Sequence, residues 1–126
     1  MKHILIIDDD KNMRAFLRLH LSHAGYDVSE AEDGEAGLHM LGVRRAELVI
    51  VDIFMPHKDG LETILELRAQ GAGCKIVAVS AGTAAINTGL NFLNHAKEFG
   101  ADAILAKPLA KETLLPTVAS LIGNAD

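Results

Sequence analysis

The sequence predicts an α/β fold in which parallel strands alternate with helices. Five short apolar runs recur along the chain, at His3–Ile7, Asp27–Ala31, Leu48–Val51, Lys75–Ser80 and Asp102–Ala106. The stretches ILII, LVIV and IVAV are continuously apolar, as strands buried on both faces are. Segments with an apolar period of about 3.6 residues lie between runs. This alternation is typical of a parallel sheet with helices on both faces.

The helices are predicted from the spacing of their apolar residues. Residues 11–24 carry one apolar stripe, formed by Met13, Phe16, Leu17, Leu21 and Ala24. Residues 60–70 and 111–122 show the same period, the former less cleanly, and a further helix is expected at about 90–99 after a loop at 81–89. The expected helix ends are marked by Gly25, Gly71 and Gly100, since glycine adopts the backbone conformation that closes a helix.

The order of the strands follows from general rules for such sheets. The run DVSEA at 27–31 is the most polar and is predicted to be an edge strand. Right-handed crossovers restrict the topologies. For five strands the leading choice is the flavodoxin-like order 2-1-3-4-5, whose crevice lies at the carboxyl ends of strands 1 and 3. The predicted fold class is therefore a flavodoxin-like (βα)5 doubly wound parallel sheet.

The composition is that of one globular domain and argues against several functions. The chain has 126 residues, of which 49% are hydrophobic, and a net charge of −5. An acidic chain lacks the basic surface that nucleic acids require, and no run of about 18 apolar residues is present to span a membrane. Cys74 is the only cysteine, so we expect no internal disulfide and a cytoplasmic location. We expect one domain over residues 1–126 with no output domain attached.

Polar residues stand where the strands are predicted to end. They are Asp8, Asp9 and Asp10 after strand 1, Asp52 after strand 3, Ser80 at the end of strand 4, and Lys107 and Pro108 after strand 5. Two carboxylates about 4 Å apart repel by roughly 1 kcal/mol in water and about 4 kcal/mol near a protein surface. A carboxylate cluster at one sheet edge therefore indicates a cation site, although Asp10 is more simply explained as the N-cap of the following helix.

The residue types at this edge suit phosphoryl transfer. Asp8, Asp9 and Asp52 offer the hard oxygen ligands that Mg²⁺ prefers. The cation would let an anionic phosphoryl donor approach Asp52, which could act as the nucleophile and form an aspartyl phosphate. The hydroxyl of Ser80 and the ammonium of Lys107 could then bind the phosphoryl oxygens.

Over essentially its full length the sequence resembles the receiver domain of bacterial two-component response regulators. The matching stretches are ILIIDDD, LVIVDIFMPHKDGLE, KIVAVSAGT and GADAILAKPL. The resemblance implies that Asp52 is the phosphoacceptor, that Asp9 binds Mg²⁺ directly, and that Asp8 orders the metal through water. It also implies that Phe54 gives its backbone carbonyl to the metal and that Ser80 is the switch hydroxyl.

The resemblance further makes Lys107 the phosphate-binding lysine, with a cis peptide bond to Pro108. The phosphoryl donor would be a sensor histidine kinase or a phosphotransfer protein. Phosphorylation would switch a face that binds a downstream protein, and a phosphorylation-dependent dimer is compatible with this interpretation. Such a chain catalyses only its own phosphorylation and dephosphorylation and is not an enzyme with an external substrate.

Two positions depart from the family pattern. Ile104 stands three residues before the lysine, where the family usually has a Tyr or Phe that rotates on activation. Leu109 replaces a frequent Phe after Pro108. Because isoleucine has neither a ring nor a hydroxyl, we expect signalling to run through loop and helix movement.

Three other classes of protein share parts of this pattern. A haloacid-dehalogenase-like phosphatase would need a second Asp two residues after the nucleophile, where this chain has Phe54. A flavodoxin would need a phosphate loop rich in hydroxyls and glycine, and aromatic residues, which make up only 4% here. The main alternative is a pseudo-receiver, a binding module that signals without phosphorylation. Ile104, in place of the usual aromatic residue, is compatible with this alternative.

The histidines are not spaced as metal ligands. His20 falls on the apolar stripe of the first helix and is predicted to lie in the core. The others are predicted to lie at the surface: His3, His23, His39, His57 and His95. Cys74 is expected to be an inert thiol in the turn before strand 4.

Overall fold

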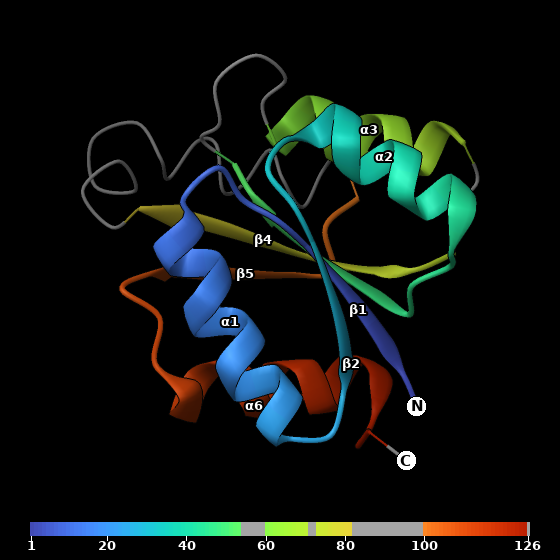
Figure 1. The fold of residues 1–126 in the computed structure, drawn as a ribbon. Coiled ribbons are helices and arrows are strands. Elements are labelled where there is room, and N and C mark those ends of the chain that lie inside the picture. The colour runs from blue at the N-terminus through green and yellow to red at the C-terminus, as the bar shows by residue number, and fades with distance from the viewer. Residues whose placement is uncertain (54–59, 71–72, 82–99, 126) are drawn as a thin grey trace.

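The computed structural model describes residues 1–53, 60–70, 73–81 and 100–125 (Figure 1). Its strands are β1 (His3–Ile7), β2 (Asp27–Ala31), β3 (Leu48–Asp52), β4 (Lys75–Ala81) and β5 (Ala103–Lys107). The helices are α1 (Lys11–His23), α2 (Gly34–Val43), α3 (Gly60–Ala69) and α6 (Lys111–Ile122). The strands pair in parallel in the order β2-β1-β3-β4-β5, which confirms the predicted topology and the edge position of β2.

The predicted boundaries differ from the observed ones by a residue at several ends. β3 continues to Asp52, β4 continues to Ala81, and β5 starts and ends one residue later than predicted. The expected loop and helix over 82–99, and Gly71, lie outside the described residues. Among the helices described, none combines the length and apolarity that crossing a bilayer requires.

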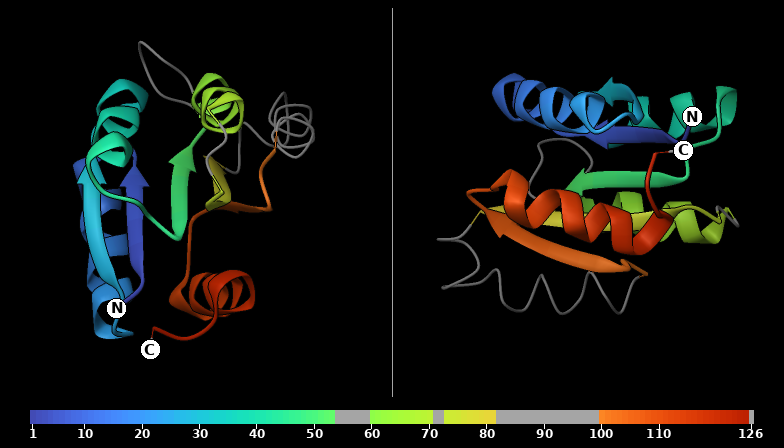
Figure 2. Two further views of the ribbon diagram at one scale, coloured as in Figure 1. Left: turned by 90° about the vertical axis from the view of Figure 1, so that its right-hand side faces the viewer. Right: turned by 90° about the horizontal axis from the view of Figure 1, so that it is seen from below.

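The helices cover both faces of the sheet and enclose two hydrophobic cores (Figure 2). The core beneath α2 and α3 includes Leu5, Ile7, Val49, Val51, Ile64 and Leu67. The core beneath α1 and α6 includes Ile4, Ile6, Leu17, Leu21, Leu114 and Val118. Successive residues of β1 thus enter opposite cores, because side chains alternate across a strand. This double burial explains why β1 is a continuous apolar run.

Aspartate caps start two of the helices. The carboxylate of Asp10 accepts a hydrogen bond of 2.9 Å from the N–H of Asn12, which confirms the predicted N-cap of α1. Asp33 caps α2 in the same way, accepting from the N–H of Ala36 at 2.8 Å. The bounds of α2 are not predicted from the sequence. The feature that marks its start is the capping residue Asp33, followed by the acidic Glu35 in the first turn.

Two glycines occupy the left-handed backbone region at predicted helix ends. Gly25 has φ of 98° just after α1, and Gly100 has φ of 122° before β5. This conformation is costly for residues with a Cβ atom, so both positions favour glycine.

His3 is buried, and its predicted surface position is wrong. Its side chain is 4% exposed, with Nδ1 2.8 Å from the carbonyl of Arg45 and Nε2 2.7 Å from the hydroxyl of Ser29. As the first residue of a central strand, His3 is enclosed by its neighbours. Burial is tolerated because both ring nitrogens have polar partners.

The remaining described histidines and the cysteine are closer to expectation. His20, predicted to lie in the core, is only half-buried on α1, with its ring centroid 4.6 Å from that of Phe16. His23 and His39 are exposed, as predicted. His57 and His95 lie outside the described residues. Cys74 is buried before β4, and burial raises the pKa of its thiol.

One close backbone approach joins α3 to the end of β3. The N–H of Gly60 donates to the carbonyl of Ile53 at 2.9 Å. A Cβ atom at Gly60 would lie 2.3 Å from the carbonyl oxygen of Asp52 and 2.6 Å from the Cα of Ile53. Only glycine fits here without moving α3 away from Asp52.

Replacing Gly60 by alanine is therefore expected to lower the free energy of unfolding by about 1–3 kcal/mol, the usual cost of overpacking. The matched control is Gly42→Ala in α2, where a Cβ atom would meet nothing within 4 Å. There alanine should add about 0.5–1 kcal/mol, since glycine is a poor helix residue. Urea denaturation of both variants checks the pair, and equal effects would contradict the steric explanation.

Candidate functional site

Three acidic side chains meet at the carboxyl ends of β1 and β3. Asp8 and Asp9 follow β1 directly, and Asp52 is the last residue of β3, its neighbour in the sheet. Carboxylate oxygens of all three lie within 4.8 Å of one another. Asp8 and Asp52 are only 2% and 5% exposed, whereas Asp9 is exposed. The predicted acidic cluster is therefore present, and it opens to solvent on the side of Asp9.

Lys107 brings a positive charge to the two buried carboxylates. Its Nζ lies 3.5 Å from Oδ2 of Asp8 and 3.4 Å from Oδ2 of Asp52. Lys107 ends β5, which is separated from β3 by β4, so its long side chain reaches past the end of one intervening strand. The Lys107–Pro108 peptide bond is cis, as the resemblance implied.

Burial and charge oppose each other at this site. Burial raises the pKa of Asp8, while the N–H of Asp10 and the ammonium of Lys107 partly counteract that rise. Burial alone would lower the pKa of Lys107, but the carboxylates of Asp52 and Asp8 outweigh it and raise that pKa. Lys107 therefore stays protonated, and within the described part of the chain three clustered carboxylates face its single charge.

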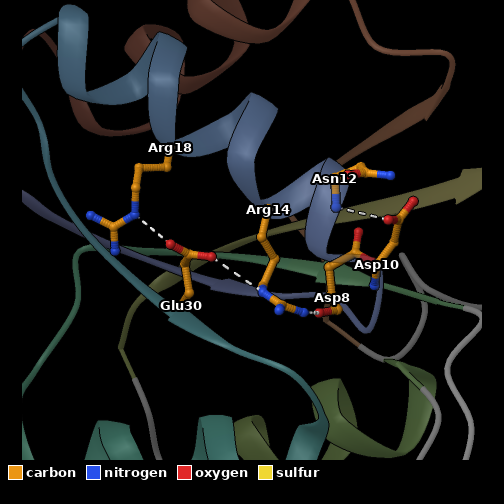
Figure 3. Close-up of polar contacts among 6 residues, drawn as sticks. All are labelled: Asp8, Asp10, Asn12, Arg14, Arg18 and Glu30. Atoms are coloured by element: carbon orange, nitrogen blue, oxygen red, sulfur yellow. Dashed lines mark hydrogen bonds and ion pairs between the residues drawn. The ribbon is translucent and has the colours of Figure 1, made fainter.

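The main chain and carboxylate of Asp8 are held by several partners (Figure 3). Its N–H donates to the carbonyl of Ala31 at 3.1 Å, and its Oδ1 accepts from the N–H of Asp10 at 2.9 Å. Its backbone carbonyl accepts from Nη1 of Arg14 at 2.6 Å. Asp8 is thus fixed in direction as well as position.

Arg14 is not among the site residues predicted from the sequence. Nε of Arg14 also donates to Oε1 of Glu30 at 3.2 Å, and Arg18 pairs with the other oxygen of Glu30 (Figure 3). The available signal was positional. Arg14 lies in the first turns of the helix that starts at the acidic cluster, so its side chain can reach back to the end of β1.

Ser80, Ile104 and Phe54 are also predicted to belong to the site or its switch. Ser80 is fully buried in β4, in register with Ala106 and one residue before the pair of Ala81 with Lys107. It therefore lies near the same sheet edge as the acids. Ile104 is half-buried and packs against the core beneath α2 and α3. Phe54 lies outside the described residues.

The donor set fits a magnesium ion. Mg²⁺ binds through a few carboxylates and keeps several waters. Two buried acids and one exposed acid, with an excess of negative charge, offer such ligands beside open solvent. The ion's charge would relieve the repulsion between the carboxylates. Asp8, Asp9 and Asp52 are the residues that would hold it.

A doubly wound sheet with acids at its switch point and a lysine bridging them is the arrangement of a signalling receiver domain. Residues 4–119 match the family model described as the response regulator receiver domain. The chain belongs to this family, whose domains are signalling modules rather than classical enzymes.

Curated relatives support the assignment. Response regulator MprA of Mycolicibacterium vanbaalenii is 35% identical over 119 residues, which is 94% of this chain and 49% of that protein. MprA of Mycobacterium avium is also 35% identical and matches over 94% of this chain and 50% of its own length. The chain spans about half the length of the curated relatives it matches.

Solved structures share the fold. Chemotaxis protein CheY4 of Vibrio cholerae superimposes with a TM-score of 0.87 at 29% identity, covering 97% of this chain and 99% of that one. A CheY-like receiver domain protein of Methanospirillum hungatei has a TM-score of 0.86 at 27% identity, covering 95% and 92%.

Asp8→Asn is expected to stabilise the metal-free protein at pH 7. A carboxyl group whose pKa is raised on folding favours the fold below its unfolded pKa, near 3.8, and loses that contribution as pH rises through the folded value. Asparagine carries no charge to bury. Substitutions that remove an unfavourable charge commonly raise the free energy of unfolding by about 0.5–2 kcal/mol. The gain should shrink as the pH is lowered. Urea denaturation in EDTA at several pH values measures it.

Asp10→Asn is the matched control, because Asp10 is exposed and asparagine also caps helices well. The difference in the free energy of unfolding between Asp10→Asn and the wild type should therefore stay small at every pH measured. A variant Asp8→Asn less stable than the wild type at pH 7 would contradict the explanation from buried charge.

Proposed function

We propose that this chain accepts a phosphoryl group on Asp52 with Mg²⁺ bound by Asp8, Asp9 and Asp52. Receiver domains take phosphoryl groups from histidine kinases or phosphotransfer proteins, and we propose a donor of that kind here. The observation that carries the proposal is the meeting of three carboxylates within 4.8 Å, two of them in contact with the ammonium of Lys107. We also propose that residues 1–126 form one receiver domain.

The chemistry is an in-line transfer to a carboxylate. An oxygen of Asp52 would form a bond to phosphorus while the bond from phosphorus to the donor's nitrogen or oxygen breaks, and the leaving group keeps that electron pair. A bound Mg²⁺ would neutralise part of the phosphoryl charge. Lys107 would attract a phosphoryl oxygen, and the Ser80 hydroxyl would donate to another. Such transfer depends mostly on positioning and on charge stabilisation.

Phosphorylation would act as a switch through the same contacts. Moving a two-state equilibrium from 1:99 to 99:1 needs about 5.5 kcal/mol of differential stabilisation. Charge-assisted hydrogen bonds from Ser80 and Lys107, at roughly 1.5–3 kcal/mol each, would supply most of it. Ile104 would contribute no ring or hydroxyl, so we propose that backbone and helix shifts carry the signal to a downstream protein.

The alternative of a pseudo-receiver has less support. A module that never accepts phosphate has no need of the full set of acids, hydroxyl and lysine, and all of these are present at the carboxyl edge of the sheet. The half-buried Ile104 packs against the core beneath α2 and α3. We therefore favour phosphorylation.

Incubation with acetyl phosphate and Mg²⁺ is expected to add the mass of one phosphoryl group to the wild type, as measured by intact-protein mass spectrometry. The adduct should be absent without Mg²⁺ and absent in Asp52→Asn. Asp10→Asn, which removes a nearby exposed acid, should still be labelled.

Two outcomes would count against this function. An adduct that persists in Asp52→Asn would place the phosphoryl group elsewhere. A wild type that gains no adduct and binds neither Mg²⁺ nor beryllofluoride would favour the pseudo-receiver.

A further inference from the structure

We propose that Arg14 is a positioning residue for the acidic site. Its guanidinium would fix the main chain at Asp8 and so set the geometry in which Asp8 and Asp9 bind a divalent cation. The inference rests on the proposed function, because it assigns Arg14 a part in the same cation site. Arg14 itself would not touch the cation or the phosphoryl group.

The guanidinium of Arg14 is held at two points that fix its plane. Nη1 donates to the carbonyl of Asp8 at 2.6 Å, and Nε donates to Glu30 at 3.2 Å (Figure 3). The side chain is only 18% exposed. A planar fork bound at two atoms loses most of its freedom, which a lysine ammonium on a flexible stem would keep.

The two contacts of Arg14 are part of a closed set of interactions at the end of β1. Glu30 precedes Ala31 in β2, and the carbonyl of Ala31 accepts from the N–H of Asp8 at 3.1 Å. Asp8 is therefore held by β2 through its N–H and by Arg14 through its carbonyl. The salt bridge from Arg14 to Glu30 joins these two supports.

The Asp8 carbonyl also determines where Asp9 lies. This carbonyl and the N–H of Asp9 belong to one planar peptide group. A hydrogen bond that fixes the carbonyl oxygen therefore fixes the direction in which the chain leaves toward the Cα of Asp9. Asp9 is exposed, so packing alone gives it little support. Outer supports of this kind orient metal ligands in many proteins.

Charge and position make opposite predictions for Arg14. A positive charge near a cation site repels the cation, so an effect of charge alone would make Mg²⁺ bind more tightly when Arg14 is removed. If Arg14 acts by holding the peptide between Asp8 and Asp9, its removal would make Mg²⁺ bind more weakly. The sign of the change in affinity therefore separates the two roles.

Arg18 provides a matched control. It lies one turn further along α1 and pairs with the same carboxylate, and Figure 3 shows it on the far side of Glu30 from Asp8. Arg18→Met removes the same charge and a bond to the same partner, while the contact between Arg14 and Asp8 stays in place.

The test is to titrate Mg²⁺ into the wild type, Arg14→Met, Arg14→Lys and Arg18→Met, with the heat of binding measured by calorimetry. Loss of an outer support typically weakens metal binding by about 10–100-fold. We expect Arg14→Met and Arg14→Lys to raise the Kd by at least about 10-fold, because lysine keeps the charge but not the fork. Arg18→Met should leave the Kd unchanged or lower it.

A second measurement does not depend on the metal. In the Mg²⁺-free proteins, the carbonyl ¹³C resonance of Asp8 and the amide ¹⁵N resonance of Asp9 report on the peptide group that Arg14 holds. Both resonances should shift in Arg14→Met and Arg14→Lys and stay in place in Arg18→Met. Arg14→Lys also serves if Arg14→Met fails to fold.

The outcomes separate this inference from the proposed function. Equal Mg²⁺ affinities for the Arg14 and Arg18 variants, or tighter binding by Arg14→Met, would overturn the positioning role while leaving phosphorylation of Asp52 intact. A wild type with no measurable Mg²⁺ affinity would overturn the cation site itself, and with it both proposals. Unmoved resonances in both Arg14 variants would overturn the positioning role whatever the metal does.

Discussion

The mutual repulsion of carboxylates at one end of the sheet is the constraint on which the rest of this structure depends. Asp8 and Asp52 lie almost completely buried on neighbouring strands, and one ammonium, that of Lys107, contacts both. The repulsion between these acids opposes the pairing of β1 with β3. They stay together because each belongs to a strand fixed by the hydrophobic cores on both faces of the sheet. Apolar burial over the whole domain therefore offsets a local electrostatic cost.

The surrounding contacts serve to keep that edge in place. Gly60 lets α3 approach the backbone at Asp52, and the cap at Asp10 starts α1 directly after the acids. Lys107 reaches the site from β5, on the other side of β4. The site is therefore assembled from segments far apart in sequence, and its geometry is only as well defined as the sheet register that brings them together. Stability and site geometry are properties of the same packing.

The fold and the acidic cluster could be predicted from the sequence because both follow from strong, simple patterns. Continuous apolar runs define buried strands, and parallel strands put their carboxyl ends at one edge, which brings Asp8 and Asp52 together. His3 was misplaced because burial of a polar ring depends on partners, Arg45 and Ser29, that are distant in sequence. The bond from Arg14 to a backbone carbonyl leaves no compositional trace, and the position of Arg14 early in α1 does not by itself identify the group that it binds.

The salt bridges of Glu30 have a consequence for association between molecules. β2 is an edge strand, and an open edge is a template on which a strand of another chain can pair. Glu30 places a carboxylate on this strand, flanked by the guanidinium groups of Arg14 and Arg18. Charged side chains on an edge strand are one of the ways in which sheets disfavour strand addition. The ion pairs beside the acidic site thus also put charge on the strand at which the sheet ends.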